Sequence, residues 1–215
     1  MTHSFDKEYW DQHWRPDGGE APVSMGVSPP NPHLVREVSA LAPGTALDAG
    51  CGVGTEAIWL AAQGWQVTAA DIASEPLARA AEAAKARGLS DHVHWVEADL
   101  SSWVPGTQFD LVTTHYAHPA MPQLDFYDRV ASWVAPGGTL LIVGHLHTHD
   151  TGHGDSCGHG QPPAEASATA AGIAARLDPQ AWEIVTADEL HRTAAEHGDH
   201  GIRLSDVVVR ALRRS

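Results

Sequence analysis

A short segment with three closely spaced glycines, residues 46–55, constrains the fold of this chain more than any other feature. The three are Gly50, Gly52 and Gly54. Residues 45–47 predict a buried strand before this segment, and residues 55–63 predict a helix after it that Gly64 ends. Glycines between a strand and a helix allow a tight turn in which the amides of the helix N-terminus face a ligand. We therefore expect a nucleotide-type cofactor at this loop.

The spacing of the glycines and a neighbouring acid separate two classes of cofactor. A dinucleotide loop has the pattern G-x-G-x-x-G, which brings a pyrophosphate to the helix N-terminus. Here the pattern is G-x-G-x-G, and the last dinucleotide glycine would fall on Thr55. Asp48, just before the turn, would repel a pyrophosphate and attract the ammonium or sulfonium of S-adenosylmethionine. We therefore predict S-adenosylmethionine rather than NAD, with a turn that binds nothing as the alternative.

Strand and helix patterns alternate along the rest of the chain, which predicts a mostly parallel sheet with helices on both faces. The other expected strands are residues 65–70, 93–97, 109–114, 139–143, 182–190 and 202–212. The other expected helices are residues 75–87, 124–134 and 168–177. Residues 136–138 predict a turn into the fifth strand, and residues 197–201 predict the turn of a C-terminal hairpin. Asp71 follows the second strand, where a carboxylate accepts the ribose hydroxyls of either cofactor class.

Length and composition indicate one compact domain. A chain of 215 residues with 43% hydrophobic content can bury one core and is short for two. We assign residues 31–215 to that domain and residues 1–30 to an N-terminal extension. Residues 1–17 contain no apolar signal core, and no stretch has the length of a membrane span, so we expect a cytoplasmic protein.

The net charge limits the expected binding partners, and the cysteine count bears on disulfide formation. A formal net charge of −14 opposes binding to a phosphate backbone, so we expect no nucleic-acid substrate and no membrane. The chain has only two cysteines, Cys51 and Cys157, which are too few for a disulfide framework and are expected to be reduced.

Five motifs in the correct order make the chain resemble the class I S-adenosylmethionine-dependent methyltransferases from about residue 31 to the C-terminus. They lie at residues 47–54, 71–72, 98–100, 109–112 and 135–140. The resemblance implies an α/β fold, a Rossmann-like doubly wound sheet of seven strands in the order 3-2-1-4-5-7-6 with strand 7 antiparallel. It also implies that Asp48 and the glycines hold the methionine part of the cofactor and that Asp71 holds the ribose. The residues implied for the adenine are Ile72, Asp99 and Leu100.

Within that class, residues 31–65 and the N-terminal Tyr9, Trp10 and Trp14 resemble small bacterial methyltransferases related to the tellurite-resistance and thiopurine types. Those relatives act on small, soft or metalloid nucleophiles, but a likeness of fold does not choose the acceptor. We therefore predict methyl transfer to a small-molecule acceptor by in-line displacement. The alternatives are metalloid or thiol methylation, and a non-catalytic module that binds the cofactor or a metal.

Three histidines follow the two central strands and are the candidate catalytic residues. His115 and His118 follow the fourth strand, and His145 follows the fifth. The carboxyl ends of strands border the ligand crevice of an open α/β sheet, so these imidazoles can converge there as bases or local cations. The alternative is that they only make hydrogen bonds at the strand ends. We expect His115 to lie closest to the cofactor and to contact it. The predicted lid over the substrate comprises Trp10, Trp14 and Tyr116, although the two tryptophans could instead anchor the extension to the core.

A second set of histidines lies in the glycine-rich segment 145–160, which is expected to be a loop. Besides His145, the possible metal ligands in this segment are His147, His149, His153, Cys157 and His159. Extended backbone would place alternate histidines on one face, where they could bind zinc or copper. A glycine-rich loop does not hold ligands rigidly, so we predict no resident metal and keep a metal site as the alternative.

Overall fold

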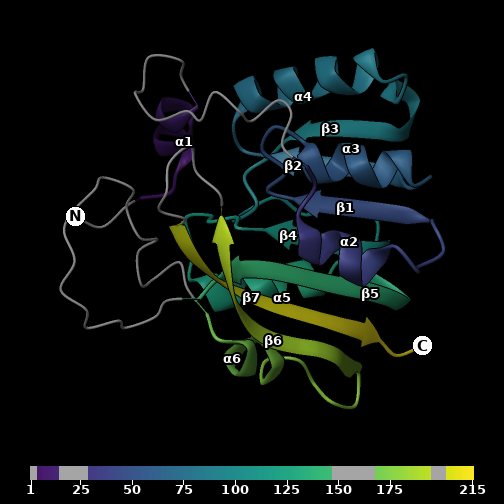
Figure 1. The fold of residues 1–215 in the computed structure, drawn as a ribbon, viewed down its shortest axis with the longest axis vertical. Helices are drawn as coiled ribbons and strands as arrows, with labels where there is room; N and C mark the ends of the chain where they lie inside the picture. The colour runs from purple at the N-terminus through teal and green to yellow at the C-terminus, as the bar shows by residue number, and fades with distance from the viewer. Residues whose placement is uncertain (1–3, 15–28, 147–167, 195–201) are drawn as a thin grey trace.

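A seven-stranded sheet in the order β3-β2-β1-β4-β5-β7-β6 forms the centre of the molecule (Figure 1). The computed structural model describes residues 4–14, 29–146, 168–194 and 202–215. The strands are β1 (Thr45–Ala49), β2 (Gln66–Asp71), β3 (Val93–Glu97), β4 (Phe109–His115), β5 (Val134–His145), β6 (Trp182–Ala194) and β7 (Ile202–Arg213). β1 to β5 pair in parallel, whereas β7 is antiparallel to both β5 and β6. The predicted strand order and the antiparallel last strand are confirmed.

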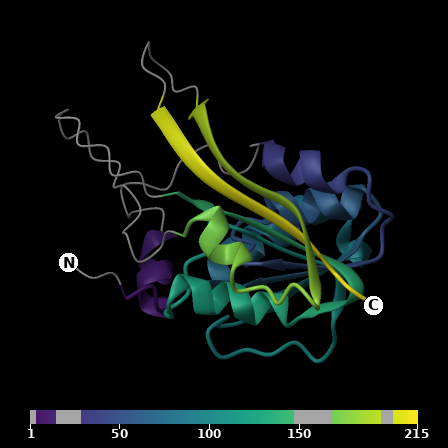
Figure 2. The same cartoon turned by 90° about the horizontal axis from the view of Figure 1, so that it is seen from below.

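Helices cover both faces of this sheet. They are α1 (Lys7–His13), α2 (Pro32–Val38), α3 (Thr55–Ala62), α4 (Ser74–Ala86), α5 (Gln123–Ala131) and α6 (Ala170–Ala174), with a 3₁₀ turn η1 (Ser90–His92). Figure 2 shows α2 and α3 on one side of the sheet and α5 and α6 on the other. The sheet is therefore a central layer between two layers of helices.

The alternation of side chains along the strands builds one core layer on each face. On β5, Leu140 and Ile142 pack in the layer under α5 and α6, whereas Leu141 and Val143 pack in the layer with α2, α3 and α4. All four side chains are fully buried. A strand that is covered on both faces needs apolar residues at successive positions, which explains its continuous apolar run in the sequence.

The region around the start of β5 differs from the sequence prediction. Helix α5 ends at Ala131 rather than at residue 134, because Val134 pairs with Phe109 and begins β5. The turn expected at residues 136–138 lies inside β5, as a shift in the register with β4. Val134 is buried within the sheet, and Trp133 is buried with its ring against Trp103 and Arg129, so the apolar character of these two residues did not mark a longer helix.

Other helices and strands also differ from their predicted boundaries. α6 covers only Ala170–Ala174 of the predicted helix 168–177, while β6 and β7 extend beyond their predicted ends. α2 was not predicted, although Asn31 and Pro32 are a typical start signal. The Asn31 side chain accepts a hydrogen bond from the His33 amide at 2.9 Å, and Pro32 is the first helical residue.

Two sequence predictions lie outside the described residues, namely the histidine-rich loop from His147 to His159 and the turn at 197–201. Within the described parts of the chain, Cys51 is a free and buried thiol. None of the described helices has the length and apolar character needed to cross a membrane.

The fully buried Phe126 of α5 gives a test of the core under this helix. We expect Phe126→Ala to lower the free energy of unfolding by about 3–5 kcal/mol, because it removes buried apolar surface and leaves a cavity. Urea unfolding measures the change. As a control, the exposed Val104 should tolerate alanine within about 0.5 kcal/mol. Equal small losses in both variants would contradict the assigned packing of α5.

Candidate active site

The glycine loop lies at the carboxyl end of β1, where α3 begins. Gly50, Gly52 and Gly54 have φ angles of +81°, +50° and +74°, in the left-handed region that side chains rarely adopt. A Cβ at Gly50 would overlap Ala117, and one at Gly54 would lie 2.5 Å from the Trp95 ring. Gly50 and Gly54 are thus required both by their backbone conformation and by the close approach of Ala117 and Trp95. This agrees with the tight turn predicted from the sequence.

Asp71, at the end of β2, fixes the shape of this loop. One carboxylate oxygen accepts a hydrogen bond from the Gly52 amide at 2.8 Å, and the other accepts from the Ala73 amide at 3.0 Å. Burial raises the pKa of this carboxyl, and the two amide hydrogen bonds partly oppose that shift. A carboxylate has about four lone-pair sites, so acceptor capacity remains for ribose hydroxyls.

Asp48 and His115 form a buried polar pair beside the loop. The Asp48 Oδ1 atom lies 3.9 Å from the His115 Nδ1 atom, which is too long for a hydrogen bond. The Asp48 Oδ2 atom and both His115 ring nitrogens are buried, and they have no hydrogen-bond partner among the described residues. Unsatisfied buried groups cost about 1–3 kcal/mol each, so they are retained where a ligand completes them. An unpaired carboxylate beside a glycine cradle fits a cationic ligand such as the one predicted.

The residues expected at the adenine lie at the ends of β2 and β3. The Asp99 side chain accepts hydrogen bonds from the amide and hydroxyl of Ser101, at 2.8 and 2.6 Å. Leu100 is buried, and one of its methyl groups lies 3.9 Å from where a Gly50 Cβ would stand. The Ile72 carbonyl accepts a hydrogen bond from Lys7 of α1 at 3.0 Å. These residues therefore border the loop on the side of β2 and β3.

Two of the three candidate catalytic histidines lie side by side. The His118 and His145 rings are stacked with centroids 5.4 Å apart, and the Tyr116 ring lies 4.6 Å from His145. The His118 Nδ1 atom lies 3.2 Å from the Gln123 side-chain oxygen, and burial lowers the pKa of His118. His115 instead lies beside Asp48, so its position is on the cofactor side of the site.

Helix α1 contacts both halves of the site, at the carboxyl ends of the strands (Figure 1). On the cofactor side, Lys7 pairs with Glu97 at 2.9 Å, and the buried Trp14 ring lies 3.3 Å from where a Gly52 Cβ would stand. On the acceptor side, the Trp10 indole donates a hydrogen bond to the His118 carbonyl at 3.2 Å. Tyr116, grouped with the lid from the sequence, is anchored to β7 through a hydrogen bond from its hydroxyl to Asp206.

Several polar residues near the site escaped the sequence analysis. They are Asn31, His33, Glu56, Gln123 and Asp206, all of which are buried or half-buried. Asp206 directly precedes three fully buried valines on β7, and an acid beside such an apolar run is a signal that could have been found. Glu56 opens α3, where burial raises its pKa, and its side chain accepts a hydrogen bond from the Asn31 amide at 3.1 Å.

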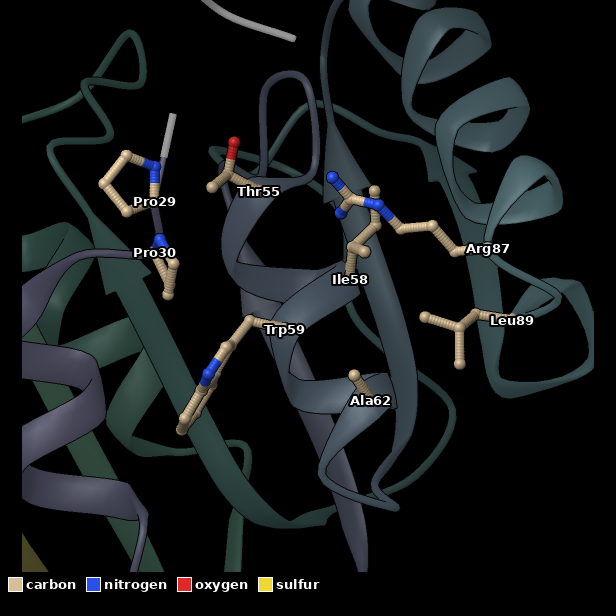
Figure 3. A pocket seen from close by; sticks show the side chains of 8 residues that line it. All are labelled: Pro29, Pro30, Thr55, Ile58, Trp59, Ala62, Arg87 and Leu89. Carbon is tan, nitrogen blue, oxygen red and sulfur yellow. The ribbon is translucent and has the colours of Figure 1, made fainter. Parts of the chain in front are cut away.

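A separate pocket of about 300 Å³ lies on the outer side of α3 (Figure 3). It is lined by Pro29, Pro30, Thr55, Ile58, Trp59, Ala62, Arg87 and Leu89. None of these is a predicted catalytic residue, although Thr55 is also the last residue of the glycine segment 46–55. Among the described residues, no group of three or more His, Cys, Asp or Glu side chains is arranged to hold a metal.

Comparison with known proteins identifies the family. Residues 46–138 match the family model described as methyltransferase domain. Thiocyanate methyltransferase 1 of Brassica oleracea is 32% identical over 157 residues, which cover 71% of this chain and 68% of that protein. Probable thiol methyltransferase 2 of Arabidopsis thaliana is 26% identical over 62% of this chain and 60% of that protein.

Two further comparisons extend this result. Ribosomal RNA small subunit methyltransferase C of Alcanivorax borkumensis is 29% identical over 47% of this chain, which spans only 32% of that protein's length. A protein solved in work on the conversion of a disulfide bond into a thioacetal group during echinomycin biosynthesis has a TM-score of 0.69. It is 22% identical, with 97% of this chain and 91% of that chain covered, and so supports the fold.

The fold, the glycine loop and these relatives together define a Rossmann-like methyltransferase domain. The chain belongs to the class I S-adenosylmethionine-dependent methyltransferases. The cofactor predicted from the glycine spacing and from Asp48, S-adenosylmethionine, is confirmed by this membership.

Replacing Asp71 tests the cofactor side of the site. We expect Asp71→Ala to weaken S-adenosylhomocysteine binding at least tenfold, because it removes the ribose acceptor and the clamp on the Gly52 amide. Hydrogen bonds to a charged acceptor contribute about 1.5–3 kcal/mol each. Isothermal titration calorimetry measures the affinity, and the exposed Asp91, replaced in the same way, is the control. Unchanged affinity in Asp71→Ala would rule out the assigned role.

Proposed function

We propose that this chain catalyses S-adenosylmethionine-dependent methyl transfer to a small-molecule acceptor by in-line displacement. The observation that carries the proposal is the buried Asp48 Oδ2 atom beside the glycine loop, which has no hydrogen-bond partner among the described residues. His118, whose ring stacks on that of His145, directly follows Ala117, which packs against Gly50 of the loop. When bound, the cofactor supplies an electrophilic methyl group on a sulfonium. The protein's part is to bind, orient and exclude water, since positioning is the main catalytic contribution to a displacement.

Each side of the site has a distinct task in this proposal. Asp48 attracts a cationic group of the cofactor, with His115 beside it, and Asp71 accepts the ribose hydroxyls. The adenine contacts are Ile72, Asp99 and Leu100. Residues 1–30 act as a lid over the domain formed by residues 31–215, a role supported by the contacts of α1 with Gly52 and with the His118 carbonyl.

The acceptor side consists of aromatic and imidazole rings, which favours a small and uncharged or polarisable acceptor. Phe5, His118, His145 and Tyr116 are joined by ring contacts of 4.6–5.6 Å. This set contains no Lys or Arg, and the chain carries a net charge of −14, both unfavourable for an RNA or DNA substrate. Some relatives are named as RNA methyltransferases, so this choice is part of the proposal. A cytoplasmic location, expected from the sequence, is also part of it.

Thiol methylation is the second candidate, and the burial of His118 favours it. A base with a pKa below 6.5 is poorly matched to phenols, whose pKa is about 10, whereas thiols ionise near 8.5 without strong help. Relatives named as thiocyanate and probable thiol methyltransferases agree with this acceptor class, as does the sequence resemblance to enzymes that act on soft or metalloid nucleophiles.

An acceptor panel with pH profiles tests both candidates. We expect methyl transfer to at least one of benzenethiol, thiocyanate, phenol and aniline, measured by S-adenosylhomocysteine release. If His118 is the base, it works only when neutral, so the rate falls as the pH drops through its pKa, which burial places below 6.5. His118→Ala then removes this acidic limb and lowers the rate most at higher pH.

Control variants and a chelator complete this experiment. His94 is exposed on β3, and His94→Ala should leave the profile unchanged. A thiol acceptor should show a smaller loss in His118→Ala than phenol does, because it needs no strong base. Abolition of activity by EDTA would favour the metal alternative, and the absence of transfer to every acceptor would contradict the proposed function.

A further inference from the structure

A buried carboxylate on β7 connects three distant segments beside the acceptor side of the site. Asp206 is 1% exposed, and its Oδ1 atom accepts a hydrogen bond from the Tyr116 hydroxyl at 2.9 Å. Its Oδ2 atom lies 3.1 Å from the Nε2 atom of His33, which is buried on α2. Asp206 therefore ties together α2, the end of β4 and β7.

If position 206 served only the packing of β7, we would expect an apolar residue there. The next three residues of β7, Val207, Val208 and Val209, are all fully buried. A buried charge is costly unless it is paired, and apolar replacements of buried ion pairs are often neutral or stabilising. The presence of a fully paired acid at this place thus points to a role for the geometry that it imposes.

Tyr116, the first partner, has a strained backbone. Its φ angle of +54° lies in the left-handed region, which costs a residue with a side chain about 1–3 kcal/mol. Such a conformation persists only where the surroundings fix it. Here the amide of Tyr116 donates to the Val143 carbonyl at 2.9 Å, and its hydroxyl is held by Asp206 and by Asn31 at 3.4 Å.

The turn at Tyr116 sets the positions of the groups that follow. It places Ala117 directly against Gly50 of the cofactor loop and leads to His118. The His145 ring lies between the Tyr116 and His118 rings, at 4.6 and 5.4 Å, and His145 is the strand neighbour of Asp206. The orientation of the Tyr116 ring therefore influences both imidazoles on the acceptor side.

We propose that Asp206, backed by His33, is a positioning residue that acts through the Tyr116 hydroxyl to align His118 and His145 with the acceptor. This inference rests on the proposed methyl transfer. Asp206 acts on the acceptor half through Tyr116, its hydrogen-bond partner after β4. It fixes the acceptor half of the site while the cofactor half is fixed separately by Asp71.

Two variants test this role, Asp206→Asn and Tyr116→Phe. Each should lower kcat/KM for the probe acceptor phenol, which depends on a base more than a thiol does, by tenfold to a hundredfold, since small misplacements of reacting groups carry losses of that order. The Kd for S-adenosylhomocysteine should change less than about threefold, within the scatter expected of an interaction that is not removed. The double variant should be no worse than the worse single variant, because both break one interaction.

Asp206→Asn weakens the partner of the buried His33 and so can also lower stability. Tyr116→Phe keeps the aromatic ring and removes only the hydroxyl, so it tests the hydrogen bond with less effect on folding. The control is Asp110→Asn, an acid on β4 that accepts hydrogen bonds from the amide and hydroxyl of Thr45 at the opposite end of the sheet. It should leave the acceptor kinetics unchanged. A parallel loss of cofactor affinity and kcat/KM in the two test variants would show a merely structural role and overturn the inference.

A readout without turnover separates this inference from the proposed function. The imidazole proton resonances of His118 and His145 should shift in Tyr116→Phe and Asp206→Asn, and stay in place in Asp110→Asn. If the wild type methylates no acceptor, the proposed function fails, and the resonances alone decide the positioning. Unchanged resonances, or unchanged kcat and KM in variants of an active enzyme, would overturn it.

Discussion

The hydrogen bond from the Gly52 amide to the Asp71 carboxylate is the contact on which the architecture of the site depends. It joins the loop after β1 to the end of β2, and it holds three successive left-handed glycines in one shape. Because this bond uses a buried carboxylate, the loop cannot relax without leaving a charge unpaired. The glycine cradle takes its shape from this bond, whereas Asp48 is placed by the pairing of β1 with β2 and β4.

The glycine loop also contacts the acceptor side of the site. Gly50 packs directly against Ala117, and Ala117 lies between the strained Tyr116 and the half-buried His118. This contact joins the two sides, while separate hydrogen bonds, to Asp71 on one side and to Asp206 on the other, fix each side in place. Helix α1 spans the same two halves, through Trp14 on the glycine loop and Trp10 on the His118 carbonyl. Cofactor and acceptor groups are thus parts of one packed unit.

The glycine loop and the sheet could be predicted from the sequence because residues close together in the chain determine them. The glycines at 50, 52 and 54 require a particular backbone, and their spacing together with Asp48 predicted the cofactor correctly. The alternating elements predicted a mostly parallel sheet, and the family resemblance implied the strand order that the structure confirms. The end of α5 was misjudged because the apolar Trp133 and Val134 continue its pattern, although Val134 is already a strand residue that pairs with Phe109.

The polar network around Asp206 was not predicted, because its partners are distant in the sequence. His33 and Asp206 are separated by 173 positions, and only the folded sheet and α2 bring them together. The same limit applies to the histidines. Their emergence from β4 and β5 predicted a common edge, but the sequence could not show that His115 lies by Asp48 while His118 and His145 stack. Side-chain direction at a strand end depends on the local turn, here the left-handed Tyr116.

We propose that the buried carboxylate of Asp48, whose Oδ2 atom has no hydrogen-bond partner among the described residues, receives a cation of the cofactor. Calorimetry with wild type and Asp48→Asn tests it most directly, using S-adenosylmethionine, S-adenosylhomocysteine and NAD as ligands. The account predicts that the wild type binds the first two and not NAD, and that Asp48→Asn weakens them by about tenfold to a hundredfold, the equivalent of one charge-assisted hydrogen bond of about 1.5–3 kcal/mol. Unchanged affinity in Asp48→Asn, or tight binding of NAD by the wild type, would contradict it.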